Sequence, residues 1–291
     1  MIIGRENVLG EQVWSNKYKM EDEVCFEDTL QRNLKEFKRK DIEILPLSID
    51  DQKMEVLSEI GKKIFMERCY HYDTLYDNMF YKSRFCPGGS VLYGIGRQKP
   101  VSLSNCFVKG NTIDSIGGIM SMARDSAEIY KRRGGVGTDI SHLRPKEAMV
   151  NNAAETSSGA VSFLNILSPV TSVIGQNGRR GALMVTMDIR HPDSIDFIQI
   201  KQDETKINGA NLSVKINDDF MRSVITDTDY ILRFPCDMII DGDVNVNDLE
   251  YNKLTKCNNG YVRKIRAKEL WNLIVKCAHN KAEPGIIFWD K

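Results

Sequence analysis

Hydrophobic positions in the first 84 residues recur at the spacing of amphipathic helices. Between Glu21 and Lys40, in a charge-rich segment, apolar side chains stand mostly three or four positions apart, at Val24, Phe26, Leu30, Leu34 and Phe37. This spacing predicts one helix. A second helix is predicted from Ser48, where hydroxyl and carboxyl side chains can cap its first turn. We therefore predict an N-terminal helical region over residues 1–84.

From residue 85 onward, short apolar strands alternate with helices. Strands are predicted at 101–108, 182–189, 210–216, 230–235 and 285–289, and helices at 114–133, 159–174, 191–201 and 267–280, with a short one after Asn217. The polar residues 241–262 are predicted to form a loop. Such alternation is typical of an α/β fold, with a mostly parallel sheet wrapped by helices, either open or closed into a barrel.

Composition excludes several classes of protein. The 40 Lys and Arg residues balance 40 Asp and Glu, which argues against a nucleic-acid binder. No apolar run reaches the roughly 18 to 20 residues of a membrane helix, and the first residues do not resemble a secretion signal. The seven cysteines include no Cys-x-x-Cys pair, so no metal site is predicted. We expect a reduced, cytoplasmic protein that binds neither nucleic acid nor membrane.

Two glycine-rich segments each allow two interpretations. Residues 134–137 (GGVG) lack the third glycine of the dinucleotide fingerprint, so they form either a helix stop with a tight turn or a surface that a ligand approaches closely. Residues 175–182 (GQNGRRGA) place two arginines beside glycines. Such a loop is either a solvated basic turn or a phosphate-binding segment, because the arginine fork suits phosphate oxygens.

Single residues are equally ambiguous when taken alone. Cys106 is either an inert core thiol or a redox group, and a redox role requires a second thiol. Asp114 and Ser115 precede a predicted helix and can serve simply as its cap. Arg144 can be an ordinary surface charge.

The order of the motifs is more informative than any one of them. The chain carries LSNCF (103–107), DSI (114–116), KRRGGVG (131–137), LRPK (143–146), NNAA (151–154), GAVSF (159–163), QNGRRG (176–181), DIRHPD (188–193), KINGAN (206–211) and EPGIIFW (283–289). In this order they strongly resemble the large (catalytic, alpha) subunit of ribonucleotide reductases, from about residue 85 to residue 291. Residues 1–84 resemble the helical lead-in of that family less distinctively.

The resemblance implies a redox role for one cysteine. In the family, a cysteine thiyl radical removes the ribose 3′ hydrogen, and a cysteine pair supplies the electrons that replace the 2′ hydroxyl. Cys106 matches the first member of that pair. Ser90 and Asn105 match substrate contacts, although serine is common at the position of Asn105, and Gly135 matches a place where backbone meets the nucleotide.

The resemblance also implies an allosteric specificity site for a deoxynucleotide or ATP. Asp114, Ser115 and Ile116 match the segment that contacts the base and sugar of the effector, and Arg144 matches a phosphate-binding residue. Residues 175–182 match the loop that relays effector identity to the substrate base, through Gln176, Arg179 and Arg180. The N-terminal nucleotide-binding cone that controls overall activity in many members is not recognisable.

The sequence departs from the family pattern in its extent. The radical cysteine, the second reducing cysteine, the substrate-phosphate loop and the C-terminal dithiol all lie, in the family, beyond the position that matches Trp289. The expected fold is therefore an N-terminal helical region followed, over residues 85–291, by the first half of a ten-stranded α/β barrel. We expect a split, intein-interrupted or truncated catalytic subunit that is inactive until the C-terminal half completes it.

The remaining expectations concern partners and cofactors. No cofactor is expected on this chain itself, and the radical source is expected to be a di-metal small subunit rather than adenosylcobalamin. Thioredoxin or glutaredoxin would be the reductant, and assembled catalytic subunits would form a dimer. Cys236, Cys257 and Cys277 match no catalytic position and are interpreted as structural.

Two alternatives stay open at this stage. One is a non-catalytic remnant that binds nucleotides through Asp114, Arg144 and the arginine loop. The other is an unrelated α/β scaffold in which that loop is only a turn.

Overall fold

A computed structural model describes residues 8–44, 87–174, 181–203, 207–240 and 244–290. The described residues form two compact units, one ending at Asn105 and the other beginning at Cys106. The boundary predicted after residue 84 and the helix predicted from Ser48 lie outside the described residues, and both stay predictions.

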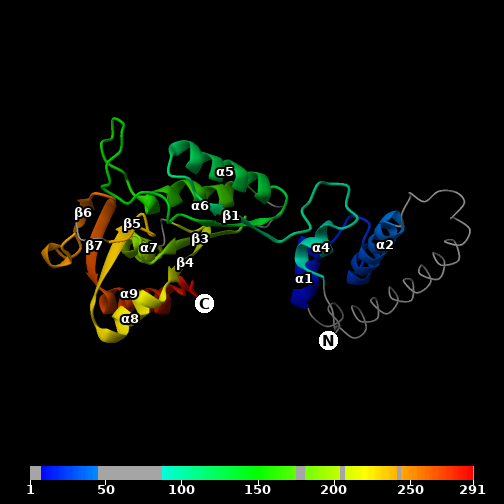
Figure 1. Cartoon of the computed structure of the whole chain (residues 1–291). Coiled ribbons are helices and arrows are strands. Elements are labelled where there is room, and N and C mark those ends of the chain that lie inside the picture. Colours follow the sequence, from blue (N-terminus) through cyan, green and yellow to red (C-terminus); the bar gives the residue numbers. More distant parts are fainter. Residues whose placement is uncertain (1–7, 45–86, 175–180, 204–206, 241–243, 291) are drawn as a thin grey trace, which may run out of the picture. The chain divides into compact units, whose positions relative to one another are not determined.

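Helices make up the regular structure of the smaller unit within its described residues. They are α1 (Val8–Lys17), α2 (Phe26–Ile44) and α4 (Gly89–Gly94) (Figure 1). The predicted helix is confirmed as α2, but Val24 precedes it and is exposed. Leu30 and Leu34 are buried as their spacing predicts. Leu30 packs with Leu92 of α4, and Tyr18 and Phe26 cover this small cluster.

A polar network joins the helices of the smaller unit. Glu23 and Arg32 form a largely buried ion pair with an N–O distance of 2.7 Å. The hydroxyl of Thr29 donates to Glu23 at 2.7 Å and accepts from the indole N–H of Trp14 at 2.9 Å. Arg32 also donates to the carbonyl of Leu92 at 2.9 Å. One ion pair therefore connects α1, α2 and α4.

The larger unit is built on a parallel sheet. Among the described residues this sheet has five strands in the order β1-β2-β3-β4-β8. Their bounds are β1 (Cys106–Asn111), β2 (Gly135–Asp139), β3 (Leu183–Asp188), β4 (Ala210–Ile216) and β8 (Gly285–Phe288). The predicted α/β fold with parallel strands is confirmed, and β4 has the predicted bounds. The strand predicted at 101–108 begins only at Cys106.

Helices connect the parallel strands. They are α5 (Ile116–Tyr130), α6 (Leu164–Val173), α7 (Ser194–Gln199), α8 (Asp218–Thr226) and α9 (Ala267–Lys281), with short 3₁₀ turns at Ala160–Phe163 and Ile200–Gln202. Figure 1 shows α5 and α6 side by side on one face of the sheet. Asn217 caps α8 as predicted, because its side chain accepts the backbone N–H of Phe220 at 2.7 Å.

A second sheet corrects two predictions. It contains β5 (Asp229–Phe234), β6 (Leu254–Cys257) and β7 (Gly260–Arg266) in the antiparallel order β5-β7-β6, with a short 3₁₀ turn at Val246–Asp248 before β6. The strand predicted at 230–235 therefore belongs to an antiparallel sheet. The loop predicted at 241–262 was wrong for β6 and the start of β7. These polar segments become strands because β7 pairs with β5, a contact distant in sequence, on one side and with β6 on the other.

Of the two interpretations of residues 134–137, the tight turn was wrong, because Gly135 and Gly137 lie within β2, while close approach of a ligand stays a prediction. That strand pairs with β1 on one side and β3 on the other. Glycines favour no strand by themselves, so β2 forms because its backbone pairs with a neighbouring strand on each side.

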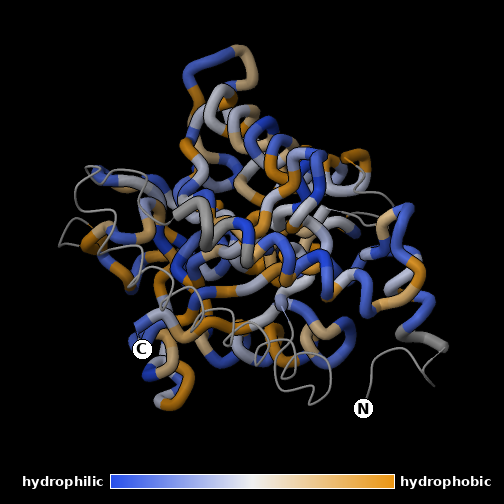
Figure 2. Tube along the Cα trace, turned by 90° about the vertical axis from the view of Figure 1, so that its right-hand side faces the viewer, coloured by the Kyte–Doolittle hydropathy of each residue, from blue (hydrophilic) through white to orange (hydrophobic). Residues whose placement is uncertain are grey.

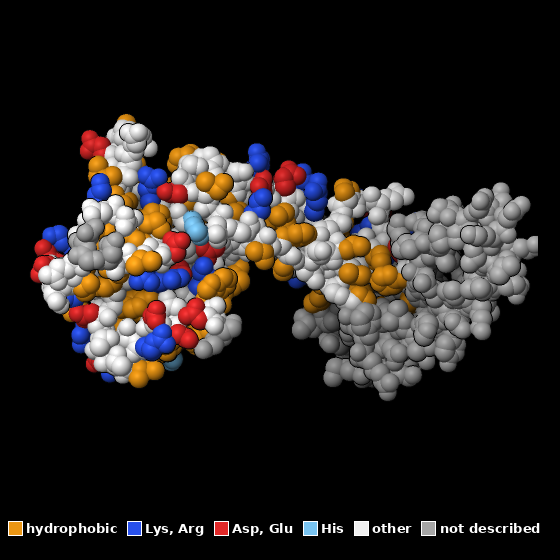
Figure 3. All heavy atoms as spheres, viewed as in Figure 1, with side chains coloured by type: hydrophobic (Ala, Val, Ile, Leu, Met, Phe, Trp, Pro, Cys, Tyr) orange, Lys and Arg blue, Asp and Glu red, His pale blue; other side chains and the backbone are white. Residues whose placement is uncertain are grey.

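The core of the larger unit lies between the parallel sheet and its helices. Its largest fully buried side chains include Tyr130, Phe197 and Phe220. Figure 2 shows hydrophobic stretches, in orange, alternating with hydrophilic ones, in blue, along the described chain. Figure 3 shows basic and acidic side chains interspersed on the visible face of the larger unit. No helix within the described ranges is long and apolar enough to cross a bilayer.

Candidate functional site

The N-terminus of α5 is capped as one of the two sequence interpretations predicts. Ser115 has extended backbone, and its hydroxyl accepts the N–H of Gly118 at 3.0 Å. Such a bond satisfies one of the free amides of the first helical turn. Ser115 is therefore the cap, which leaves the neighbouring carboxylate of Asp114 available for another partner.

That partner is Arg144, thirty residues away in the sequence. The Nε of Arg144 donates to Oδ2 of Asp114 at 2.8 Å, and the backbone N–H of Arg144 donates to Oδ1 at 3.2 Å. A guanidinium Nη also donates to the carbonyl of Met149 at 3.1 Å. Both side chains remain about one-third exposed, at 34% for Arg144 and 30% for Asp114. The pair is thus ordered but accessible to a ligand.

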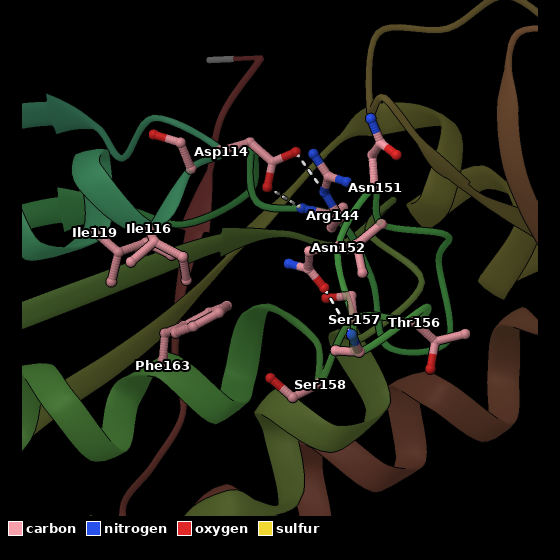
Figure 4. Close-up of a pocket in the computed structure, with 13 residues that line it drawn as sticks. Asp114, Ile116, Ile119, Arg144, Asn151, Asn152, Thr156, Ser157, Ser158 and Phe163 are labelled. Atoms are coloured by element: carbon pink, nitrogen blue, oxygen red, sulfur yellow. Dashed lines mark hydrogen bonds and ion pairs between the residues drawn. The ribbon is translucent and has the colours of Figure 1, made fainter.

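A cavity of about 450 Å³ opens beside this pair. The residues that line it are Asp114, Ser115, Ile116, Ile119, Arg144, Val150, Asn151, Asn152, Ala154, Thr156, Ser157, Ser158 and Phe163. Figure 4 shows Ile116, Ile119 and Phe163 gathered on one side of the cavity and the amide and hydroxyl side chains on the other. The cavity therefore has an apolar wall and a polar wall, with the ion pair at one end.

Much of the polar wall is a loop that projects from the larger unit, visible in green in Figure 1 and in outline in Figure 3. Its neck is closed by a bridge between Met149 and Thr156 and by a hydrogen bond of 2.9 Å from the N–H of Val150 to the carbonyl of Glu155. Glu155 has a left-handed φ of 61° that permits this turn.

The sequence interpretation assigned no role to these wall residues. The structure brings all four predicted effector residues, Asp114, Ser115, Ile116 and Arg144, to one cavity, but the polar wall was missed. Its only signal is a run of small polar residues, NNAAETSS at 151–158, with neither helical nor strand periodicity. Such a run is typical of a loop that presents amides and hydroxyls.

The predicted substrate residues form two pairs in the structure. Cys106 begins β1 with an exposed side chain, and it lies opposite Gly135, which begins β2. In the smaller unit, the N–H of Ser90 donates to the side-chain oxygen of Asn105 at 3.1 Å. The Ser90 hydroxyl is buried and has no hydrogen-bond partner. These four roles stay predictions.

The other predicted site residues have different outcomes. Gln176, Arg179 and Arg180 lie outside the described residues, so the specificity loop stays a prediction.

Two of the cysteines interpreted as structural are buried or largely buried. Cys277 is buried in the core of the larger unit. Cys236 is largely buried, its thiol donates to the carbonyl of Ser141 at 3.7 Å, and burial raises its pKa well above the ordinary value. Such a thiol is a poor nucleophile at neutral pH.

A buried ion pair connects three of the parallel strands. Lys215 of β4 contacts Asp139 of β2 at 2.9 Å, and the hydroxyl of Thr186 of β3 donates to the same carboxylate at 2.6 Å. Burial would raise the pKa of Asp139, but these partners and Ser141 outweigh it and hold the pKa below its usual value. Within the described part of the chain, no cluster of three or more His, Cys, Asp or Glu side chains forms a metal site.

Residues 104–291 match the family model described as the barrel domain of ribonucleotide reductase. The chain belongs to the ribonucleotide reductase family. The parallel sheet of the larger unit is consistent with part of that barrel domain.

The relatives of this reductase chain include enzymes named as vitamin B12-dependent and one named as a subunit alpha. The vitamin B12-dependent ribonucleoside-diphosphate reductase of Thermoplasma acidophilum is 34% identical over 223 residues, which cover 76% of this chain and 26% of the relative. The vitamin B12-dependent enzyme of Mycobacterium tuberculosis (strain CDC 1551 / Oshkosh) is 32% identical over 212 residues, 71% of this chain and 27% of the relative. The ribonucleoside-diphosphate reductase subunit alpha of Helicobacter pylori (strain J99) is 29% identical over 198 residues, 65% of this chain and 25% of the relative.

Two facts follow from these relatives. The reductase chain spans about a quarter of the length of the curated relatives it matches. Two of the three are named as vitamin B12-dependent, which counts against the di-metal small subunit that we expected as the radical source.

Proposed function

We propose that this chain provides the nucleotide effector site and one redox thiol of a ribonucleotide reductase that acts on ribonucleoside diphosphates. The observation that carries the proposal is the meeting of Asp114, Arg144 and the capped start of α5 at one cavity with an apolar and a polar wall. The diphosphate class is supported by the names of the relatives.

Each wall of the cavity suits a different part of a nucleotide. The guanidinium of Arg144 and the positive end of the α5 dipole favour phosphate oxygens. The side chains of Ile116, Ile119 and Phe163 offer a surface on which a base can lie. Asp114 can accept a ribose hydroxyl once phosphate draws Arg144 away, because the two anions compete for one guanidinium.

Calorimetric titration with dATP, dGTP, dTTP and ATP tests the effector site. Arg144→Ala should weaken binding by about tenfold or more, because a charge-assisted bond to phosphate is lost. Arg124→Ala is the matched control, since Arg124 is an exposed arginine of α5 outside the cavity. No binding of any of the four nucleotides by the unaltered chain would contradict the proposal.

Cys106 is proposed as one thiol of the reducing pair. Two thiols and the ribose C2′–OH would give C2′–H, water and a disulfide, so two electrons and two hydrogens leave the thiols. The exposed position of Cys106 at the start of β1 supports this role, since the thiol is accessible. Thioredoxin or glutaredoxin would reduce the disulfide after each turnover.

We further propose that the reaction needs reductase residues beyond this sequence, in a C-terminal partner that completes the barrel and brings the radical cysteine. The support is that the chain spans about a quarter of its relatives. The radical source is proposed to be a vitamin B12 cofactor rather than a small subunit. The described residues identify no site for a corrin, so no step is derived through it.

Reconstitution tests the catalytic proposal. The chain combined with a segment encoding the rest of a reductase, adenosylcobalamin, a ribonucleoside diphosphate and a dithiol reductant should form deoxynucleotide, and Cys106→Ala should abolish it. Turnover by the chain alone would contradict the need for a partner. Effector binding with no activity under any combination would favour a non-catalytic remnant instead.

Allosteric control is proposed to run from this cavity to the substrate through Gln176, Arg179 and Arg180. Ser90, Asn105 and Gly135 are proposed to contact the substrate, in a dimer of assembled subunits in the cytoplasm. Two states of the loop with different affinities for substrate would couple the sites.

A further inference from the structure

The segment between β3 and α7 contains an aspartate whose hydrogen bonds are unusual for its position. Asp193 immediately precedes α7, where an aspartate ordinarily caps its own helix. It makes no such bond. Its carboxylate is buried and instead accepts backbone amides from a segment more than thirty residues earlier.

Those amides lie at the two ends of the segment that forms the polar wall. Both carboxylate oxygens of Asp193 accept the N–H of Lys146, at 3.0 and 3.1 Å. Its Oδ2 also accepts the N–H of Ala160 at 2.9 Å. Seven of the residues that line the cavity beside α5 lie between these two points, in the range 150–158.

His191 contacts the backbone just before this segment. Its ring is fully buried, with Nε2 at 2.8 Å from the carbonyl of Leu143 and Nδ1 accepting the N–H of Asp193 at 3.0 Å. This arrangement places the ring proton on Nε2, facing the carbonyl. Leu143 precedes Arg144, so the histidine orders the backbone that carries the cavity's cation.

Gly159 shows how closely the carboxylate and the loop approach each other. Its φ of 93° lies where side chains are strained, and a Cβ there would stand 2.8 Å from Oδ2 of Asp193 and 2.8 Å from Cβ of Lys146. Only glycine leaves room for the carboxylate to reach the N–H of Ala160 beside it.

We infer that Asp193 is a positioning residue for nucleotide binding: it lines no part of the cavity but fixes both ends of the loop that forms its polar wall. This inference rests on the proposed effector site, and it states that Asp193 fixes the position of the polar wall of that site. A purely structural aspartate would contribute to the stability of the fold without affecting the affinity of the folded chain.

Two variants and a control of the full chain separate these roles, with dATP as the probe. Asp193→Asn keeps the shape of the side chain but replaces one carboxylate oxygen by an NH₂ group, which cannot accept the backbone N–H groups of Lys146 and Ala160. Gly159→Ala displaces the carboxylate while keeping its charge. Asp196→Asn is the control, because Asp196 lies three residues away on α7 and is exposed. Calorimetry gives the dATP affinity, and hydrogen exchange gives the opening of residues 146–160 relative to β3 and β4.

We expect Asp193→Asn to raise the Kd for dATP by about tenfold, which is about 1.4 kcal/mol, and Gly159→Ala to raise it by about threefold. Exchange should accelerate in residues 146–160 but not in β3 or β4, and the control should bind within about twofold of the unaltered chain. A folded Asp193→Asn chain that binds dATP normally, with unchanged exchange in the loop, overturns the inference.

The remaining outcomes are also decisive. If Asp193→Asn does not fold, Gly159→Ala decides by the same two measurements. If the unaltered chain binds no dATP or other nucleotide, the proposed effector site fails. The exchange data then still decide whether Asp193 fixes the loop, so the two failures are distinguishable.

Discussion

The two units of this chain achieve their order in different ways. The larger unit buries a continuous apolar core between its parallel sheet and helices. The smaller unit has, in its described part, only a small cluster around Leu30 and Leu92, and its helices share the buried Glu23–Arg32 network. Apolar burial is tolerant of small changes in geometry, whereas a buried ion pair loses most of its value when one partner is removed.

The largest expected effect comes from truncating the core of the larger unit. Phe197→Ala removes a fully buried ring and leaves a cavity, so the free energy of unfolding should fall by about 3–5 kcal/mol. Urea denaturation followed by circular dichroism measures it. Ile225→Ala on the exposed face of α8 is the control and should change the free energy by less than about 0.5 kcal/mol. A loss below about 1 kcal/mol in the Phe197 variant would break the comparison.

In the smaller unit, the sensitive element is polar. Glu23→Gln leaves Arg32 buried without its counter-ion, so the free energy of unfolding of the smaller unit should fall by about 3 kcal/mol. Trp14 reports on the smaller unit when Trp271 and Trp289 are replaced by Phe, so its fluorescence during denaturation gives the measurement. Glu11 is an exposed residue of α1, so Glu11→Gln should leave the free energy of unfolding unchanged and serves as the control. Equal stability of the two variants would show that the network is dispensable.

A third prediction uses pH to test the apolar core of the larger unit, where a tyrosine hydroxyl is buried. Burial raises the pKa of Tyr130 to about 12, with the hydroxyl of Ser126 acting in the opposite direction. The unfolded phenol ionises near pH 10, so this tyrosine makes stability fall as pH rises from about 10 to 12.

Tyr130→Phe removes that dependence. At pH 11 the variant should gain about 1.4 kcal/mol over the unaltered chain, relative to their difference at pH 8. Denaturation curves at both pH values provide the comparison, and ionisation of other groups cancels between the two chains. The same difference at both pH values would contradict the prediction.

The smallest effect is expected at a helix end. Ser115→Ala removes the cap of α5 and should cost about 1 kcal/mol, while Ser115→Asp keeps an acceptor and should restore most of it. Thermal denaturation of the three chains measures the difference. Failure of Ser115→Asp to restore stability would assign the effect to something other than the cap.

The α/β organisation followed from the sequence because β3, β4 and β8 carry apolar runs, and 210–216 was predicted with the observed bounds. The glycine-containing strand β2 was not predicted. Nor did the antiparallel sheet follow from the sequence. The strand β7 buries Lys264, whose amine lies over the ring of Tyr251 and 3.5 Å from Asp229. A charged residue on a buried face breaks the alternation of apolar and polar residues that predicts a strand, so β7 is defined by its pairing with β5 and β6.

The candidate site was predictable to a similar degree. Motif order brought Asp114, Ser115, Ile116 and Arg144 together, and the structure places them at one cavity. The polar wall at 150–158 carries no periodicity, so its position depends on tertiary bonds. The decisive one is to Asp193, which the sequence pattern placed within a predicted helix at 191–201 and gave no role of its own.

The two amide contacts of Asp193 fix the ends of the projecting loop, so the length of the loop can change without affecting the rest of the fold. With Lys146 and Ala160 fixed, extra residues at the tip add only the slowly growing entropy of a longer loop. Peptides or reporter groups inserted near Ala153 would then leave the sheet intact while altering what the cavity admits. Ligand preference at this position can therefore diverge through insertions without new core packing.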